Sequence, residues 1–243
     1  MIFLRSLAFL AFMSLSVVVF SVPIGIFGWF VPYAWLGKAG KLWGRMNLAA
    51  LRKICHLRYR VRGWENFPPH PCVILCKHQS TWETIALRAL LPPEHTWVLK
   101  RELLWVPFFG WALAPFRPIA INRKDGRGAL RQLLDEGRRT LDNGHSIVIF
   151  PEGTRVAPGE RIRYGFGGAL LAEKTGYPVL PVAHNAGIFW RRRDIRKHPG
   201  TIDLVVGEVM ETTGVKASEI NRRVEDWIEE TVASLPVKLP PRT

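Results

Sequence analysis

Three stretches of this chain place reactive polar side chains directly after short apolar runs. The three runs, each with the polar residues that follow it, are Val73–Cys76 before Lys77-His78-Gln79-Ser80-Thr81-Trp82-Glu83, Ile147–Phe150 before Pro151-Glu152-Gly153-Thr154-Arg155, and Trp97–Leu99 before Lys100-Arg101-Glu102. Apolar runs without alternation are typical of buried parallel strands. Ligands bind beyond the carboxyl ends of such strands, so we expect the three polar stretches to meet at one edge of a sheet.

The first candidate pair is His78 and Glu83. If a helix starts just after His78, the carboxylate in its first turn is close enough to hold the imidazole. A histidine held in this way is a competent general base for a hydroxyl group. A second interpretation stays open, because Ser80 and Glu83 have the spacing of a helix capping box, in which the glutamate only reaches back to a backbone N–H.

The second candidate site is the turn Glu152-Gly153-Thr154-Arg155. Gly153 lets backbone N–H groups approach a ligand, Thr154 offers a hydroxyl donor, and the guanidinium of Arg155 matches phosphate oxygens. Lys100, at the end of a neighbouring run, could add a second positive charge. The alternative is an ordinary turn with a solvated arginine.

Other catalytic machineries leave no signature in the sequence. There is no Gly-x-Ser-x-Gly, His-Glu-x-x-His, Gly-x-x-x-x-Gly-Lys or Gly-x-Gly-x-x-Gly stretch. Cys76 precedes His78 by two residues, but its apolar surroundings favour inert packing over a nucleophilic role. Cys55, Cys72 and Cys76 are too few for a disulfide framework and lack zinc spacing, which indicates a reduced compartment. Direct transfer to a bound hydroxyl is therefore the simpler mechanism.

Positioning these side chains requires strands that alternate with helices. The alternation predicts an α/β fold with a largely parallel central sheet flanked by helices. The candidate strands are Leu57–Val61, Cys72–Cys76, Thr96–Leu99, Arg117–Ile121, Ser146–Phe150, Val179–Ala183 and Thr201–Val206. The candidate helices are Thr81–Leu90, Arg127–Leu141, Gly168–Lys174 and Ala217–Leu235.

Residues 1–37 have a different character and predict a membrane anchor. Ser6 to Gly37 is a run of 32 residues without a charge, and as one helix it would be roughly 48 Å long against a hydrocarbon core of about 30 Å. Pro23 and Gly25 interrupt the run, so we expect either a single span before them or a re-entrant hairpin of two half-length helices. A cleaved signal peptide is the alternative. The basic residues that follow favour a retained anchor with a cytoplasmic catalytic domain.

The predicted organisation has three parts. Residues 1–37 form the anchor, residues 38–56 a basic interfacial helix, and residues 57–243 the catalytic domain, with its motif-bearing core at 72–187. The formal net charge is +14, and residues 1–63 contain nine basic residues and no acidic one. A membrane-tethered nucleic-acid-binding module would explain both this charge and the cluster Arg191-Arg192-Arg193 with Arg196 and Lys197. No nucleic-acid motif is present, and binding to anionic membrane lipids explains the charge with fewer assumptions, so we expect no nucleic-acid partner.

Four blocks follow one another along the chain: His78-x-x-x-x-Glu83, Lys100-Arg101-Glu102-Leu103 with Pro107, Gly110 and Trp111, Phe150-Pro151-Glu152-Gly153-Thr154-Arg155, and Val179-Leu180-Pro181-Val182-Ala183-His184-Asn185-Ala186-Gly187. In this order they resemble the glycerolipid acyltransferases, specifically the bacterial 1-acyl-sn-glycerol-3-phosphate acyltransferases. By that resemblance His78 is the base for the glycerol hydroxyl and Glu83 orients it, while Lys100 and Arg155 hold the substrate phosphate. Glu152, Gly153 and Thr154 would shape the phosphate loop, and Arg123 is a weaker phosphate candidate. The family usually has Asp where this chain has Glu83.

The resemblance also implies the reaction. A fatty acyl group would pass from an acyl thioester, either acyl-coenzyme A or acyl carrier protein, to the sn-2 hydroxyl of 1-acyl-sn-glycerol-3-phosphate, giving phosphatidic acid. It implies no bound cofactor and no metal. The expected location is the cytoplasmic face of a bacterial inner membrane. Another lysophospholipid or an acylated amino-acid lipid remains an alternative acceptor.

Overall fold

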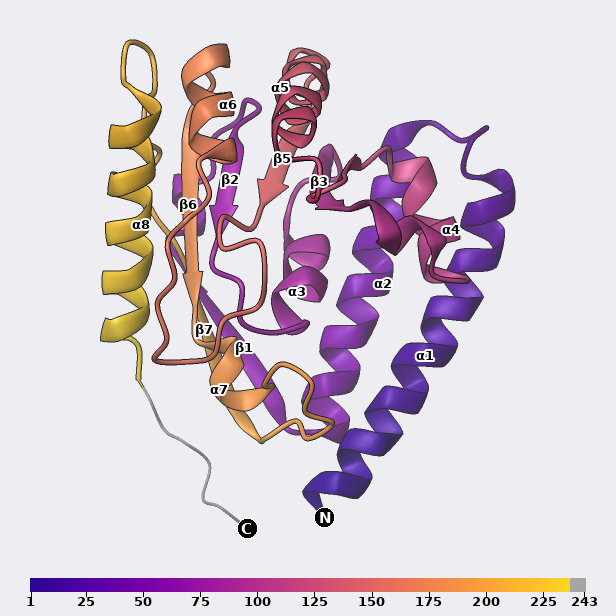
Figure 1. Cartoon of the computed structure of the whole chain (residues 1–243). Coiled ribbons are helices and arrows are strands. Elements are labelled where there is room, and N and C mark those ends of the chain that lie inside the picture. Colours follow the sequence, from indigo (N-terminus) through magenta and orange to yellow (C-terminus); the bar gives the residue numbers. More distant parts are fainter. Residues whose placement is uncertain (237–243) are drawn as a thin grey trace.

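A seven-stranded sheet with the strand order β1-β7-β6-β2-β5-β3-β4 forms the centre of the molecule (Figure 1). The computed structural model describes residues 1–236, so residues 237–243 of the predicted catalytic domain lie outside it. The strands are β1 (Leu57–Arg62), β2 (Val73–Cys76), β3 (His95–Lys100), β4 (Ile119–Ile121), β5 (Ser146–Ile149), β6 (Val179–His184) and β7 (Gly200–Val206). Each candidate strand from the sequence is found, with ends that differ by at most two residues.

Strand direction brings the polar stretches to one edge. β2 pairs in parallel with both β5 and β6, and β5 pairs in parallel with β3. The carboxyl ends of these strands therefore share an edge, at the lower side of the sheet in Figure 1. β7 is antiparallel to β6 but parallel to β1, so the sheet is largely, not wholly, parallel.

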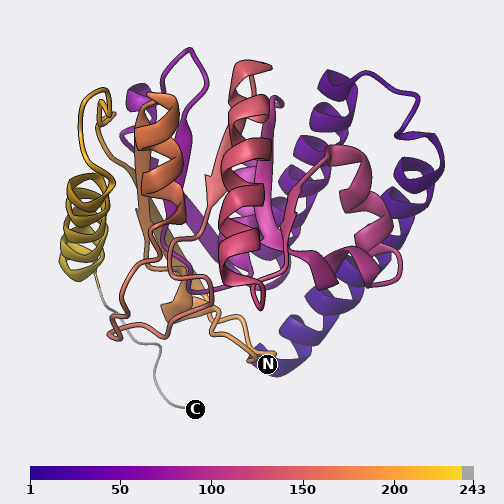
Figure 2. The same ribbon diagram turned by 45° about the horizontal axis from the view of Figure 1, so that its top comes forward.

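Helices cover both faces of the sheet, as the alternation of the elements predicts (Figure 2). Alternate residues of β2 separate the two cores: Ile74 belongs to the cluster with α2 and α3, and Val73 belongs to the cluster with α5, α6 and α8. The four predicted helices are confirmed as α3 (Trp82–Leu90), α5 (Gly126–Asp142), α6 (Gly167–Thr175) and α8 (Ala217–Ser234).

The N-terminal segment differs from the expected break at Pro23 and Gly25. Helix α1 (Ile2–Phe27) continues through Pro23, and the chain reverses only after it, before α2 (Tyr33–Ile54) begins. Proline removes one N–H donor from the ladder. The end of α1 packs closely against the domain, since a Cβ at Gly25 would lie 3.2 Å from the Cβ of Trp111. The two half-length helices within residues 1–37 are therefore wrong, and the boundary at residue 37 falls inside α2.

Helix α2 packs closely on α3 because glycines line its inner face. A Cβ at Gly37 would lie 2.6 Å from the Cβ of Pro93, and one at Gly44 would lie 2.9 Å from the Cβ of Ala89. The Lys41 ammonium donates to the carbonyls of Leu90 and Leu91, at 3.2 Å each. One charge of the predicted interfacial helix thus caps the end of α3.

The segment after β3 contains short helices that the sequence pattern does not predict. They are η2 (Arg101–Trp105), α4 (Phe109–Leu113) and η3 (Ala114–Phe116), and η1 (Trp64–Asn66) and α7 (Ala186–Phe189) are similarly short. Helix α4 lies beside α1 (Figures 1 and 2). Trp105, Phe108 and Trp111 leave much of their apolar surface exposed there.

Candidate active site

His78 and Glu83 form a hydrogen-bonded pair at the carboxyl end of β2. His78 Nδ1 lies 2.8 Å from Glu83 Oε1. The imidazole stacks on the Phe150 ring, with 4.0 Å between ring centroids and 13° between planes. The Glu83 carboxylate is an acceptor, so the bond assigns the proton to Nδ1 and leaves Nε2 unprotonated. This arrangement is that of an oriented general base.

The same carboxylate oxygen also caps helix α3. Glu83 Oε1 accepts the N–H groups of Gln79 at 2.9 Å and of Ser80 at 2.7 Å, while Ser80 Oγ accepts the N–H of Trp82 at 3.2 Å. The capping interpretation and the catalytic one therefore hold together. The cap fixes the carboxylate that orients His78.

The Glu83 carboxylate is fully buried and yet stays ionised. Burial alone would raise its pKa, but His184, His78 and the Ser80 N–H oppose this effect, and the pKa is lowered below its ordinary value. The carboxylate is therefore negative at neutral pH and can stabilise an imidazolium on His78.

The turn after β5 clamps the main chain of His78. Glu152 Oε2 accepts the His78 N–H at 2.6 Å, and the Val156 N–H donates to the His78 carbonyl at 2.8 Å. Gly153, in the turn, has φ of 66°, a left-handed conformation that favours glycine. The predicted base and the predicted phosphate loop therefore form one hydrogen-bonded unit.

A buried ion cluster lies behind this turn, and the sequence analysis missed it. Lys77 Nζ lies 2.8 Å from Glu152 Oε1 and 2.6 Å from Glu229 Oε1, and Tyr164 donates to the same Glu229 oxygen at 2.7 Å. Burial raises the pKa of Glu152 to about 7, against the lowering effect of Lys77. No spacing in the sequence links Lys77 to Glu229 of helix α8, which lies 152 residues away.

The predicted phosphate ligands occupy different positions around the turn. Arg123 donates to the Gly153 carbonyl, so this weaker candidate lies directly at the loop. Arg155 is half-buried, and within residues 1–236 no carboxylate pairs with its guanidinium. Lys100, at the end of β3, is half-exposed and lies 3.3 Å from Glu102 Oε1. Arg192, considered above only as part of a basic cluster, donates to the Arg155 carbonyl at 3.1 Å.

Glu152 does not point its carboxylate at solvent. It is buried between Lys77 and the His78 main chain, which agrees with a loop-shaping role and not with direct contact to a phosphate. Thr154 is exposed at the tip of the turn. Arg123, Arg155 and Lys100, which the sequence predicts as phosphate ligands, therefore lie near this edge together with Arg192.

Cys76 is an inert neighbour of the pair. It is fully buried, and desolvation with the nearby Glu83 and Glu152 raises its pKa well above the ordinary value. The thiol is therefore protonated at neutral pH and is a poor nucleophile. Cys55 and Cys72 are likewise buried and unpaired with each other.

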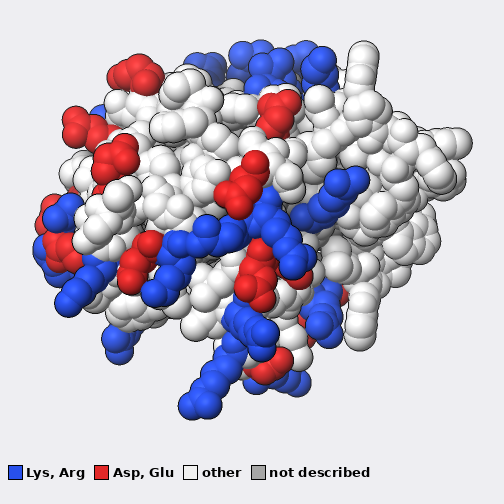
Figure 3. Space-filling view, turned by 90° about the horizontal axis from the view of Figure 1, so that it is seen from above, with Lys and Arg blue, Asp and Glu red and all other residues white. Residues whose placement is uncertain are grey.

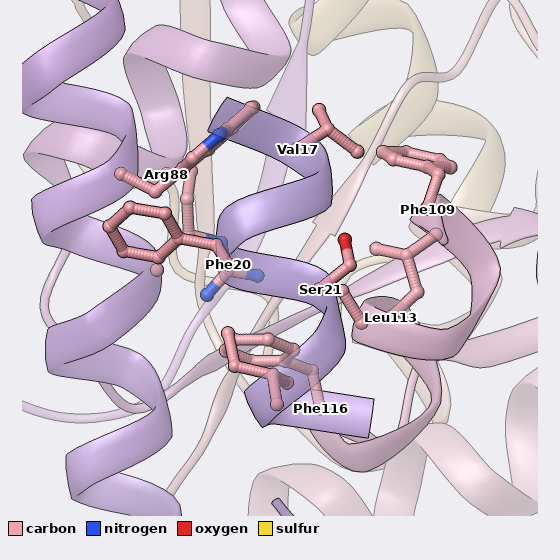
Figure 4. A pocket seen from close by; sticks show the side chains of 11 residues that line it. Val17, Phe20, Ser21, Arg88, Phe109, Leu113 and Phe116 are labelled. Atoms are coloured by element: carbon pink, nitrogen blue, oxygen red, sulfur yellow. The ribbon is translucent and has the colours of Figure 1, made fainter. Parts of the chain in front are cut away.

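An apolar cavity lies between α1, α2, α3 and α4 (Figure 4). Arg88 is its charged lining residue, and its Nη1 has no hydrogen-bond partner within the described part of the chain. Burial lowers the pKa of this guanidinium to about 10. Its charge lies 4.7 Å from the Phe116 ring centroid and 5.7 Å from that of Trp97. Trp97 in turn lies 5.8 Å from the Phe150 ring that supports His78. The cavity is lined by Val17, Phe20, Ser21, Ile24, Gly40, Trp43, Arg88, Phe109, Ala112, Leu113 and Phe116.

Comparison with known proteins gives one consistent result. Residues 58–185 match the acyltransferase family. Over 196 residues, or 79% of this chain and 76% of the relative, the chain is 49% identical to a 1-acyl-sn-glycerol-3-phosphate acyltransferase of Pseudomonas aeruginosa. It is 32% identical over 142 residues to the enzyme of that name from Helicobacter pylori, covering 56% of this chain and 60% of the relative. The crystal structure of the 1-acyl-sn-glycerophosphate (LPA) acyltransferase PlsC from Thermotoga maritima shares the fold, with a TM-score of 0.79 at 22% identity over 95% of this chain and 94% of that one.

Proposed function

Because this chain belongs to the acyltransferase family, we propose that the His78–Glu83 pair catalyses its reaction. The chain is an O-acyltransferase that moves a fatty acyl group from an acyl thioester to the sn-2 hydroxyl of 1-acyl-sn-glycerol-3-phosphate, and the product is phosphatidic acid. The observation that carries the assignment is the 2.8 Å contact between His78 Nδ1 and the buried Glu83 carboxylate.

The geometry supports direct transfer without a covalent enzyme intermediate. His78 Nε2 removes the hydroxyl proton as the oxygen attacks the thioester carbonyl carbon. The carbon–sulfur bond then breaks, and the His78 imidazolium returns its proton to the thiolate, which leaves as the free thiol. Glu83 stabilises the transient imidazolium. General-base assistance supplies typically about 10²–10⁴-fold, so positioning of the two substrates must supply much of the remainder.

The acceptor phosphate is held by Arg155, Arg123 and Lys100. The loop that carries Arg155 also binds both sides of the His78 main chain, so a phosphate on this loop fixes the acceptor relative to the base. The Arg155 guanidinium supplies two parallel donors to phosphate oxygens. Glu152, Gly153 and Thr154 shape the turn.

We propose that the α1–α2 hairpin anchors the enzyme in a membrane, so that this site lies at the membrane surface. α1 is apolar and long enough to cross a membrane, yet it contacts the domain near both ends. Ser6 Oγ accepts the Lys197 N–H at 2.8 Å, and the other end packs on Trp111 and Pro115. These contacts favour a hairpin embedded in one leaflet over a free span, with the catalytic domain on the cytoplasmic face. A tag at Met1 should then be protected from protease added outside sealed, right-side-out vesicles of the native membrane. Cleavage of the tag from outside would contradict the hairpin.

The test of the reaction is a thiol-release assay with purified protein. It pairs acyl-coenzyme A or acyl carrier protein thioester with 1-acyl-sn-glycerol-3-phosphate, other lysophospholipids and an acylated amino-acid lipid. We expect the fastest release with 1-acyl-sn-glycerol-3-phosphate, and product analysis should show the new ester at the sn-2 position. Faster acylation of an acceptor that lacks the phosphomonoester would overturn the proposed acceptor. The same assay decides which thioester is the preferred donor.

A further inference from the structure

One oxygen of the Glu83 carboxylate has no hydrogen bond. All three bonds of this carboxylate converge on Oε1, from His78, Gln79 and Ser80, while Oε2 is fully buried and has no partner among residues 1–236. A buried carboxylate oxygen without compensation is costly. His184 Nε2 lies 3.8 Å from this oxygen.

His184 is fully buried, and its hydrogen bonds fix its tautomer. Its Nδ1 accepts the Ala186 N–H at 3.2 Å, so the neutral ring carries its proton on Nε2. Nε2 lies 2.9 Å from the carbonyl oxygen of Lys77 and donates to it. Lys77 immediately precedes His78. The Nε2–H group therefore donates to the carbonyl of the residue that precedes His78, and it also faces the free oxygen of Glu83.

The ring of His184 is held in place and stays neutral. The buried Trp82 ring packs against it edge to face, with 6.0 Å between centroids. Burial lowers the pKa of His184, although Glu83 opposes this effect. A neutral donor stabilises the Glu83 anion without cancelling its charge, and so leaves that charge available to His78.

We propose that His184 is a positioning residue for the acyltransferase reaction, because its Nε2–H fixes the Lys77 carbonyl before His78 and stabilises the Glu83 carboxylate on the side opposite the base. This inference rests on the proposed function of the His78–Glu83 pair. The carboxylate then lies between two imidazoles, of which one does chemistry and the other holds the geometry. The role requires a hydrogen-bond donor at the Nε2 position.

Two substitutions of His184 separate its nitrogen atoms. The amide nitrogen of Gln in His184→Gln can occupy the Nε2 position and keep the donor, whereas His184→Asn reaches only the Nδ1 position. We expect His184→Gln to retain kcat within about 5-fold of the wild type and His184→Asn to lose about 10- to 100-fold, since the hydrogen bond to the Lys77 carbonyl and the N–H dipole that faces the Glu83 carboxylate are both lost. KM for 1-acyl-sn-glycerol-3-phosphate should change less than about 3-fold in both variants, because neither touches the phosphate side.

A matched control uses His95, which is also buried but binds the Pro92 carbonyl at the other end of β3. His95→Asn should lower the melting temperature without changing kcat per folded molecule. Equal kcat for the Gln and Asn variants of His184, or a loss confined to KM, would overturn the inference. So would a loss of kcat in His184→Asn that His95→Asn matches at the same melting temperature. Wild-type protein that does not acylate the lysophosphatidate, or full turnover by His78→Ala, would instead overturn the proposed function itself.

Discussion

At the carboxyl edge of the sheet, the charged side chains of Lys77, Glu83 and Glu152 have little or no exposure to solvent. On the α1–α2 hairpin, by contrast, large apolar side chains are exposed, among them Val19 at 58% and Phe30 at 86%. Figure 3 shows the molecule from above, and the side at the right, where α1 and α4 lie, carries few charged groups. Both arrangements are unfavourable in water alone.

The two regions differ in how the unfavourable burial or exposure is compensated. At the sheet edge every buried charge named above has a partner inside the protein, such as Glu152 for Lys77 and His78 for Glu83. The exposed apolar surface of the hairpin has no such partner in the described structure, and the lipid bilayer that we propose would supply it. The buried charges of the active site are therefore stabilised by partners within the protein, whereas the exposed apolar surface of the anchor needs a partner outside the protein.

The largest expected effect comes from removing the base. His78→Ala should lower turnover by about 10³-fold or more, since the general base and its stabilised imidazolium are both lost. Thiol release per folded molecule is the measurement, and circular dichroism checks that the fold is intact. Turnover within 10-fold of the wild type would remove His78 from the mechanism.

The second prediction concerns the buried ion pairs of Lys77. Lys77→Met leaves the buried Glu152 and the mostly buried Glu229 without their cation and should lower the free energy of unfolding by about 3–5 kcal/mol. Denaturant unfolding in detergent measures this change. Arg161→Ala, which breaks an exposed pair with Glu225, is the matched control and should cost at most about 1 kcal/mol. Equal losses in the two variants would contradict the compensation argument.

A charge on the hairpin tests the external compensation. Val19→Lys should leave the fold intact by circular dichroism, because the side chain is exposed on the surface of the protein. Its partition into vesicles should fall by about 10- to 100-fold, since a lysine is costly in hydrocarbon. Val19→Leu is the control. Unchanged partition of the lysine variant would show that this face of α1 does not contact lipid.

The phosphate ligands should affect binding more than chemistry. Arg155→Ala should raise KM for the phosphorylated acceptor by about 10-fold, with a smaller change in kcat. Arg155→Lys should not restore KM fully, because a point charge lacks the planar pair of donors. Lys100→Ala should have the weaker effect, as Lys100 is half-exposed and already paired with Glu102. An increase confined to KM for the acyl donor would show that these residues bind the donor and not the phosphate of the acceptor.

The smallest expected effect is a pH dependence of stability. The pKa of Glu152 is raised to about 7 in the folded protein, above the ordinary value of about 4.3 in an unfolded chain. The folded state therefore holds the proton more tightly, so this contribution to stability is present at acid pH and is lost as pH rises through about 7. The free energy of unfolding of the wild type, minus that of Glu152→Gln, should fall by about 1–2 kcal/mol between pH 5 and pH 8. A rise over this interval would contradict the sign.

Much of the sheet could be predicted because each element carries its own local signal. Val73–Cys76 and Ser146–Ile149 are short apolar runs, and the start of α3 has capping residues at Ser80 and Glu83. The hairpin could not be predicted in detail. Pro23 usually ends a helix, but here the contacts of α1 with Trp111 and Pro115 support the helix beyond it.

The α/β alternation, the pair His78 and Glu83, and the cationic turn at Arg155 follow from the sequence, because each depends on residues close together in the chain. Three contacts emerge only from the folded chain: Glu229 reaches Lys77, Arg123 lies at the turn, and His184 faces the free oxygen of Glu83. These contacts join residues 30 to 152 positions apart. They exist because parallel strands bring their carboxyl ends to one edge, and no local pattern encodes which distant side chain arrives there.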